Sequence, residues 1–207
     1  MSIKYKIHTS DSKVVGNTTV YRIVAITDFG CVKKGDKGGW IEREANLSHD
    51  GECWVSDDAC VYNNARVSDD ARVSGNARVS DDAEVSGNAE VSGNAWVFND
   101  AWVYGNAWVY DNARVSDDAE VSGNARVSGN AWVYDNARVS DDARVFNDAS
   151  VYGNARVYGN ARVSGNAWVY DNARVSDDAS VYGNARVYGN ARVSGNARVS
   201  DDARVNE

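Results

Sequence analysis

The chain has 207 residues, and its 43% apolar content is carried mainly by Ala and Val rather than by Leu, Ile and Phe. The net charge of −8 arises beyond residue 50, where 14 Lys and Arg stand against 24 Asp and Glu, and a surface of this sign disfavours direct binding to nucleic acid phosphates. No run approaches the roughly 18 apolar residues of a membrane span and no signal peptide is evident, so we expect a cytoplasmic protein that does not contact membranes.

Residues 1–38 follow no repeat. Within them, residues 21–26 read as an apolar strand that is followed by a loop rich in Gly and Lys. We predict that this segment is a small cap over one end of the domain formed by residues 39–207.

The segment between the cap and the regular repeat contains an irregularity. The small-x-aliphatic pattern begins at Gly39 and resumes at Cys53 after two extra residues near Gly51 and Glu52, which predicts a bulge at a corner. Cys31, Cys53 and Cys60 lie outside any C-x-x-C spacing, and their odd number argues against a disulfide framework. Cys53 occupies an Ala position and is expected to be a small buried residue.

From Val55 to Val205 a Val stands at every sixth position, and from Ala59 to Ala203 an Ala stands at every sixth position. Short strands of the form A-x-V-x alternate with two-residue corners drawn from Gly, Asn and Asp, residue types that tolerate a positive φ. Because side chains alternate between the faces of a strand, Ala and Val point inward together. Three corners close a triangular coil of about 18 residues, and about eight stacked coils give a rod roughly 40 Å long.

Aromatic residues occupy the positions that point outward. All seven Trp residues stand between the small and the aliphatic residue, and at 18 residues per coil four Tyr residues fall in one column. Exposed aromatic patches usually mark contacts with partners, although such side chains also stack on one another and stiffen a rod. The candidate interaction surface is Trp96, Trp102, Trp108, Trp132, Trp168, Tyr134, Tyr152, Tyr170 and Tyr188.

Arginines also form columns. Arg114 and Arg186 alternate with Trp in one column, which predicts cation–π pairs one coil apart. On the neighbouring face a ladder of like charges runs through Arg138, Arg156, Arg174 and Arg192. We expect corner carboxylates to compensate this ladder, namely Asp141, Asp142, Asp177 and Asp178.

Acidic corner residues stack on one edge in three successive coils, and oxygen-rich clusters of this kind suit Ca²⁺. The edge contains Asp81, Asp82, Asp100, Asp117 and Asp118. The glycine-rich nonapeptide of calcium-binding β-rolls is absent, so we predict no metal site. We also predict no cofactor and no catalytic residue.

The repeat runs to residue 205 without a closing segment, and an uncovered coil would expose unpaired backbone groups and the ends of the Val columns. We therefore expect a homo-oligomer that forms face to face or end to end at the C-terminal end, or a partner protein that docks there. The candidate residues of this end are Val193, Val199, Arg204 and Val205.

The hexad V-x-x-x-A-x, as in residues 73–78, resembles the repeat of hexapeptide-repeat proteins, whose fold is a left-handed parallel β-helix. Residues 25–33 with Gly35, Gly38 and Trp40 look like the entry segment of a bacterial and phage branch whose members often carry a transferase label. The resemblance implies an all-β, left-handed, single-stranded solenoid. Its acyltransferase relatives are trimers that bind acyl-CoA between coils and use a catalytic His.

Only His8 and His49 are present, and no long loop interrupts residues 55–205. We therefore predict a non-enzymatic structural or interaction module that acts through its aromatic columns or its C-terminal end. Two alternatives stay open. One is a trimeric acyl-CoA-dependent transferase that would rely on His49, and the other is an acidic decoy that imitates nucleic acid.

Overall fold

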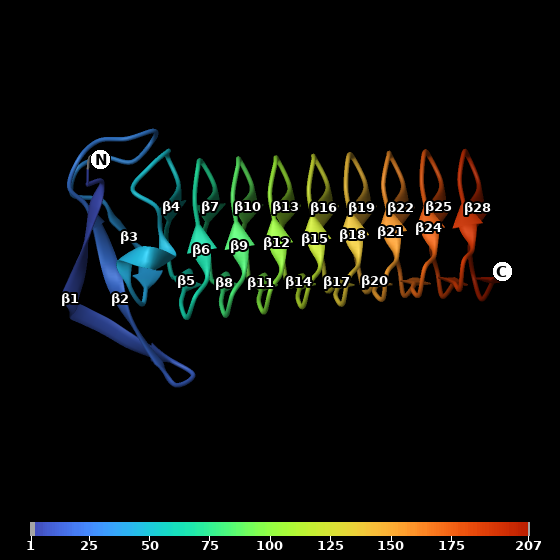
Figure 1. Cartoon of the computed structure of the whole chain (residues 1–207), viewed down its shortest axis with the longest axis horizontal. Helices are drawn as coiled ribbons and strands as arrows, with labels where there is room; N and C mark the ends of the chain where they lie inside the picture. Colours follow the sequence, from blue (N-terminus) through green and yellow to red (C-terminus); the bar gives the residue numbers. More distant parts are fainter. Residues whose placement is uncertain (1–2, 207) are drawn as a thin grey trace.

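The computed structural model describes residues 3–206, which form an N-terminal hairpin followed by a regular parallel β-solenoid (Figure 1). Strands β1 (Tyr5–Val15) and β2 (Thr18–Ala25) form the hairpin, and β2 also pairs in antiparallel orientation with β3 (Lys37–Ile41). A short 3₁₀ helix, η1 (Glu44–Asn46), follows β3. None of the helical structure within residues 3–206 has the length and hydropathy to span a bilayer.

Three parallel sheets make the three sides of the solenoid. The first side continues from β3 through β5 (Cys60–Val61), β8 (Arg78–Val79), β11 (Trp96–Val97), β14 (Arg114–Val115), β17 (Trp132–Val133), β20 (Ser150–Val151), β23 (Trp168–Val169), β26 (Arg186–Tyr188) and β29 (Arg204–Asn206). The second side contains β6 (Arg66–Val67), β9 (Glu84–Val85), β12 (Trp102–Val103), β15 (Glu120–Val121), β18 (Arg138–Val139), β21 (Arg156–Val157), β24 (Arg174–Val175) and β27 (Arg192–Val193). The third side contains β4 (Trp54–Val55), β7 (Arg72–Val73), β10 (Glu90–Val91), β13 (Trp108–Val109), β16 (Arg126–Val127), β19 (Arg144–Val145), β22 (Arg162–Val163), β25 (Ser180–Val181) and β28 (Arg198–Val199).

The strand register confirms the predicted coil of 18 residues, since Glu90 pairs with Trp108 and Trp132 pairs with Ser150. The first, second and third sides have ten, eight and nine strands, so the solenoid has about nine coils, one more than expected, because the irregular segment from β3 to β4 forms a coil of its own. In that coil Trp40 pairs with Cys60, a spacing of 20, so the two extra residues are accommodated there as predicted.

The inward Ala and Val columns are buried as the alternation predicted, for example at Ala101, Val103, Ala107 and Val109, each 0% exposed, except in the last coil, where Ala197 and Ala203 are exposed. This core is one continuous cluster, which also includes Ile23 of the hairpin. Burial of apolar surface contributes about 25 cal/mol per Å², so a narrow core of many small residues still stabilises the rod along its whole length.

Each corner turns through a residue with a positive φ, for example Asp141 at 60° and Gly105 at 73°. This backbone region favours Gly, Asn and Asp, which explains the composition of the corners. A Cβ placed on Gly105 would lie 3.0 Å from the backbone N of Gly123 in the next coil, because consecutive corners stack directly.

Backbone hydrogen bonds join each coil to the next in one direction. The N–H of Arg66 donates to the carbonyl of Ala83 at 2.9 Å, and the N–H of Ser68 donates to the carbonyl of Val85 at 3.0 Å. Side-chain amides repeat this pattern at the corners, where Asn76 donates to Asn94 at 3.3 Å. Coils are therefore locked in register by both backbone and corner contacts.

Candidate functional site

The position after each Val on the first side carries Tyr in four successive coils. The ring centroids are 4.9 Å apart for Tyr134 and Tyr152, 4.9 Å for Tyr152 and Tyr170, and 5.2 Å for Tyr170 and Tyr188, with planes within 6° of parallel. The predicted column is confirmed, and each of its rings stacks on its neighbours.

Burial within this column acts on the phenol groups. The pKa of Tyr152 is raised to about 12, mainly by burial and to a smaller extent by the neighbouring Tyr134 and Tyr170. Burial, with a smaller effect of Asp135, also raises the pKa of Tyr134. Both hydroxyls therefore stay protonated further into the alkaline range than a free phenol does.

Two tryptophans flank the Tyr column on strands β17 and β23. Trp132 is 45% exposed and Trp168 is 39% exposed, which is unusual for residues of this size. The Arg114 guanidinium lies 4.9 Å from the Trp132 ring and that of Arg186 lies 4.7 Å from the Trp168 ring, so the predicted cation–π pairs are confirmed. Together with the Tyr column, these four residues form what we call the aromatic face.

The remaining tryptophans of the predicted surface do not all join the aromatic face. Trp96 lies on the first side and is half-buried against Phe98, with ring centroids 4.8 Å apart. Trp102 and Trp108 are 53% and 42% exposed but lie on the second and third sides, because each hexapeptide advances the chain by one side.

Trp40 and Trp54 occupy outward positions as predicted, but they are only 6% and 8% exposed. The N-terminal segment covers the outside of the first coil at both residues. Phe29 packs edge-on against Trp54 at 5.4 Å. Trp40 contacts Arg22 at 3.8 Å and Lys13 at 4.6 Å, both measured to its ring centroid.

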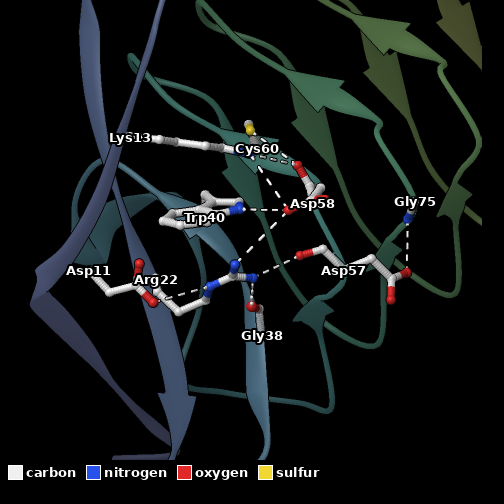
Figure 2. Close-up of polar contacts among 9 residues, drawn as sticks. All are labelled: Asp11, Lys13, Arg22, Gly38, Trp40, Asp57, Asp58, Cys60 and Gly75. Atoms are coloured by element: carbon white, nitrogen blue, oxygen red, sulfur yellow. Dashed lines mark hydrogen bonds and ion pairs between the residues drawn. The ribbon is translucent and has the colours of Figure 1, made fainter.

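A polar cluster holds the hairpin on the first coil (Figure 2). Arg22 donates from Nη1 to the carbonyls of Gly38 at 2.9 Å and Asp57 at 3.0 Å, and its Nε lies 3.6 Å from Asp11. The indole N–H of Trp40 donates to Asp58 at 3.3 Å. Apart from Arg22 Nε, which is buried and makes no hydrogen bond, these groups are hydrogen-bonded within the chain, and the cluster clamps the hairpin to the first coil.

Further anchors of the hairpin have no counterpart in the repeat and were not found from the sequence. Tyr5 donates its hydroxyl to the carbonyl of Leu47 at 2.7 Å, and burial raises its pKa. Lys4, only 5% exposed, donates from Nζ to the carbonyl of Gly51 at 2.9 Å.

The cysteines have different surroundings. Cys53 is 0% exposed, which confirms the predicted buried role, and burial raises the pKa of its thiol and that of Cys60. Both thiols are therefore protonated and poor nucleophiles near neutral pH. Cys31 is exposed and free.

The predicted arginine ladder lies on the second side, on strands β18, β21, β24 and β27. Arg138 forms an ion pair with Glu120, with Nε and Oε2 3.3 Å apart, and Glu120 also accepts a hydrogen bond from Tyr104. Within residues 3–206, Arg156, Arg174 and Arg192 form no ion pair.

The prediction that corner carboxylates compensate this ladder is wrong. Asp141 and Asp177 instead accept hydrogen bonds from the backbone N–H groups of Gly159 and Gly195 in the next coil, each at 3.0 Å. Asp142 and Asp178 accept hydrogen bonds from Asn side chains of the preceding coil, each at 3.1 Å. These carboxylates are therefore bonded to the adjacent coils and form no ion pair with the ladder, although Asp141 lines the same groove as Arg138, Arg156 and Arg174.

The carboxylates of the predicted acidic edge also accept hydrogen bonds from corner side chains of the preceding coil. Asn63 donates to Asp81 at 2.9 Å, and Asn99 donates to Asp117 at 2.7 Å. In the described part of the chain, no three His, Cys, Asp or Glu side chains converge in a way that could hold a metal ion.

His49 lies in the irregular first coil, where its ring stacks on Tyr5 with centroids 4.3 Å apart and its Nδ1 accepts from the backbone N–H of Lys4 at 3.3 Å. It lines a surface cavity of about 480 Å³ together with Glu44, Arg66 and Glu84. His8 lies on β1, near Ser10.

The predicted C-terminal residues lie in the last coils of the three sides. Val193 and Val199 are 4% and 9% exposed, Val205 is half-buried and Arg204 is exposed.

Comparison with known proteins connects this fold to a repeat family. Overlapping segments within residues 65–87, 119–135 and 137–198 match the YdcK Beta solenoid repeat. A relative from Escherichia coli (strain K12), named "Uncharacterized acetyltransferase YdcK", is 42% identical over 45 residues. These residues are 22% of this chain and 14% of the relative, so the match spans only a small part of that protein.

Proposed function

We propose that this chain, a β-solenoid of YdcK-type repeats, is a structural and binding module whose aromatic face docks a partner protein. The observation that carries the proposal is the group of Trp132 and Trp168 beside the Tyr column, with Arg114 and Arg186 against the Trp rings. Tyr, Trp and Arg are the residues in which interface binding energy concentrates.

The rigidity of the aromatic face supports this role. Adjacent Tyr rings are within 6° of parallel, and each coil is bonded to the next along the backbone. A surface whose side chains are already ordered loses little conformational entropy when a partner binds, which favours affinity. Docking at the C-terminal end stays a separate prediction.

Photo-crosslinking tests the proposal. We would place a photo-reactive amino acid at position 132 or 168 and, as the control, at position 108, where an equally exposed Trp lies on the third side. The proposal predicts a discrete crosslinked protein from positions 132 and 168 and none from position 108. Equal products from all three positions, or none from any, would count against it.

The transferase alternative has one observation in its favour besides the name of the relative. His49 is half-buried at the edge of a cavity of about 480 Å³, and a general base must reach its substrate within a hydrogen bond. If the chain were such an enzyme, acyl-CoA would bind at this cavity, and replacement of His49 would abolish acyl transfer.

A further inference from the structure

The second side is the only side on which charge is divided along the rod. Its outward column begins with Arg66, continues with Glu84, Trp102 and Glu120 on β9, β12 and β15, and ends with four arginines on β18, β21, β24 and β27. The first side from β5 onward has no acidic residue in the equivalent column, and the third side has only Glu90.

Apart from the Glu120–Arg138 pair, the charges of this side form no ion pair among the described residues. Across residues 3–206, Glu84, Arg156, Arg174 and Arg192 form no ion pair, while Glu120 pairs with Arg138. The edge between the first and second sides adds Asp82, Asp100 and Asp118 beside the acidic half. Asp141, Asp142, Asp177 and Asp178 lie at the opposite edge of the basic half, but they are held in corner hydrogen bonds.

We propose that the second side is a dimer interface that binds the second side of another copy of this chain in antiparallel orientation. A two-fold axis that crosses the side at β18 reverses the rod direction, so that β9 faces β27, β12 faces β24 and β15 faces β21. Both copies have the same coil spacing, so the pairs repeat coil by coil without a mismatch.

In this register Glu84 faces Arg192 and Glu120 faces Arg156 of the second copy, and both pairs occur twice. Trp102 faces Arg174, an arrangement suited to cation–π contact. Arg138 lies on the axis, where its ion pair with Glu120 of its own chain limits repulsion.

The size of side chains supports the same register. In the column after each Val, Tyr104 faces Ser176 and Tyr158 faces Ser122, so each large ring of one copy meets a small side chain of the other. A groove of about 300 Å³ already exists beside Ser122 and Ser140. A shift of the axis by half a coil toward β15 would place Tyr104 against Tyr158 and Arg66 against Arg192, and a shift by half a coil toward β21 would place Arg138 against Arg156.

The area of the second side limits the affinity of the dimer. Seven coils about 4.8 Å apart and a side of about five residues at about 3.3 Å each give a face of about 34 Å by 17 Å. Two copies would bury a total of about 1,200 Å², the lower limit for specific interfaces. We therefore expect a weak dimer, which does not use the aromatic face and leaves it free for a partner.

Sedimentation equilibrium of the full chain, between micromolar and millimolar concentrations, tests the interface. Glu84→Arg and Arg192→Glu should each weaken the dimer at least about ten-fold, because each change places like charges together twice. The matched controls are Glu90→Arg and Arg198→Glu, which make the same changes one hexapeptide later, on the third side. They should leave the dimer unchanged.

A mixture of the two second-side variants restores every opposite-charge pair, because position 84 of one chain faces position 192 of the other. The mixture should therefore form a heterodimer with the affinity of the unmodified chain, which also shows that both variants are folded. A chain that is monomeric or trimeric at every concentration, a dimer that resists both reversals, equal losses in the controls, or a mixture that fails to associate would overturn the proposal.

Discussion

At the scale of single residues, the corner carboxylates add side-chain hydrogen bonds to the backbone bonds that join one coil to the next. Asp141 adopts φ 60° and accepts the N–H of Gly159 at 3.0 Å. The left-handed conformation is tolerated by Asp, Asn and Gly, while the hydrogen bond requires a side-chain oxygen. The backbone conformation and hydrogen bonds of the corners therefore determine which residues stand there, and the acidic charge of the rod follows from that composition.

Substitutions at Asp141 separate these two requirements. Asp141→Ala should lower stability by about 2 kcal/mol, because it leaves a backbone N–H without an acceptor and strains the corner. Asp141→Asn keeps an oxygen and tolerates the same φ, so it should stay within about 1 kcal/mol of the unmodified chain. Urea unfolding followed by circular dichroism measures both, and equal losses in the two variants would contradict this account.

The titration of Tyr152 gives a second prediction at this scale. Its pKa is about 12 in the folded chain against 10.0 for the free side chain, because burial disfavours the charged form. The folded state thus holds the proton more tightly, so this contribution to stability is complete below pH 10 and is lost as pH rises toward 12.

Absorbance of tyrosinate followed from pH 9 to 13, and urea unfolding across the same range, test this effect. Tyr152→Phe should remove one late-titrating phenol and reduce the alkaline loss of stability. An unchanged titration curve in that variant would show that another group is responsible.

At the scale of elements, the Tyr column should stabilise the first side beyond the burial of each separate ring. Tyr152→Ala breaks two stacked pairs, each worth about 0.5–1.5 kcal/mol. Tyr158→Ala removes the same side chain from the second side, where Ser140 and Ser176 are its column neighbours. Unfolding free energies should differ by about 1–3 kcal/mol, with Tyr152→Ala the less stable. Similar losses would mean that stacking adds nothing.

The repeat made most elements predictable from the sequence. Because Val and Ala recur every six residues, arithmetic alone assigned the core, the corners and the column of Tyr134, Tyr152, Tyr170 and Tyr188. The hairpin could not be derived in this way, since Tyr5, Lys4 and Arg22 make contacts far along the chain that no period describes. For the same reason Trp40, outward in the repeat pattern, is buried beneath a segment outside the repeat.

The corner carboxylates mark a second limit of prediction from the sequence. Spacing placed Asp141 and Asp177 beside the arginine ladder but did not give the direction of their side chains. An N–H in the next coil lies closer to each carboxylate than any guanidinium does, and it takes the hydrogen bond. A prediction of ion pairs from the spacing of charges in the sequence therefore gives too many pairs wherever backbone N–H groups without a partner lie nearby.

At the scale of the whole molecule, three sides with different surfaces share one core. The first side carries the aromatic face, the second side carries the divided charge, and the hairpin covers the first coil (Figure 1). A rod of this kind can hold two contacts at once, because residues on different sides do not compete for the same surface. We propose that the chain works through these surfaces and not through catalysis.

Calorimetric titration of acetyl-coenzyme A into the chain and into a His49→Ala variant tests that claim most directly. The account predicts no saturable binding to either protein up to millimolar ligand, together with circular dichroism spectra that agree. Saturable binding to the unmodified chain that His49→Ala removes would contradict it and would assign the cavity beside His49 to an acyltransferase.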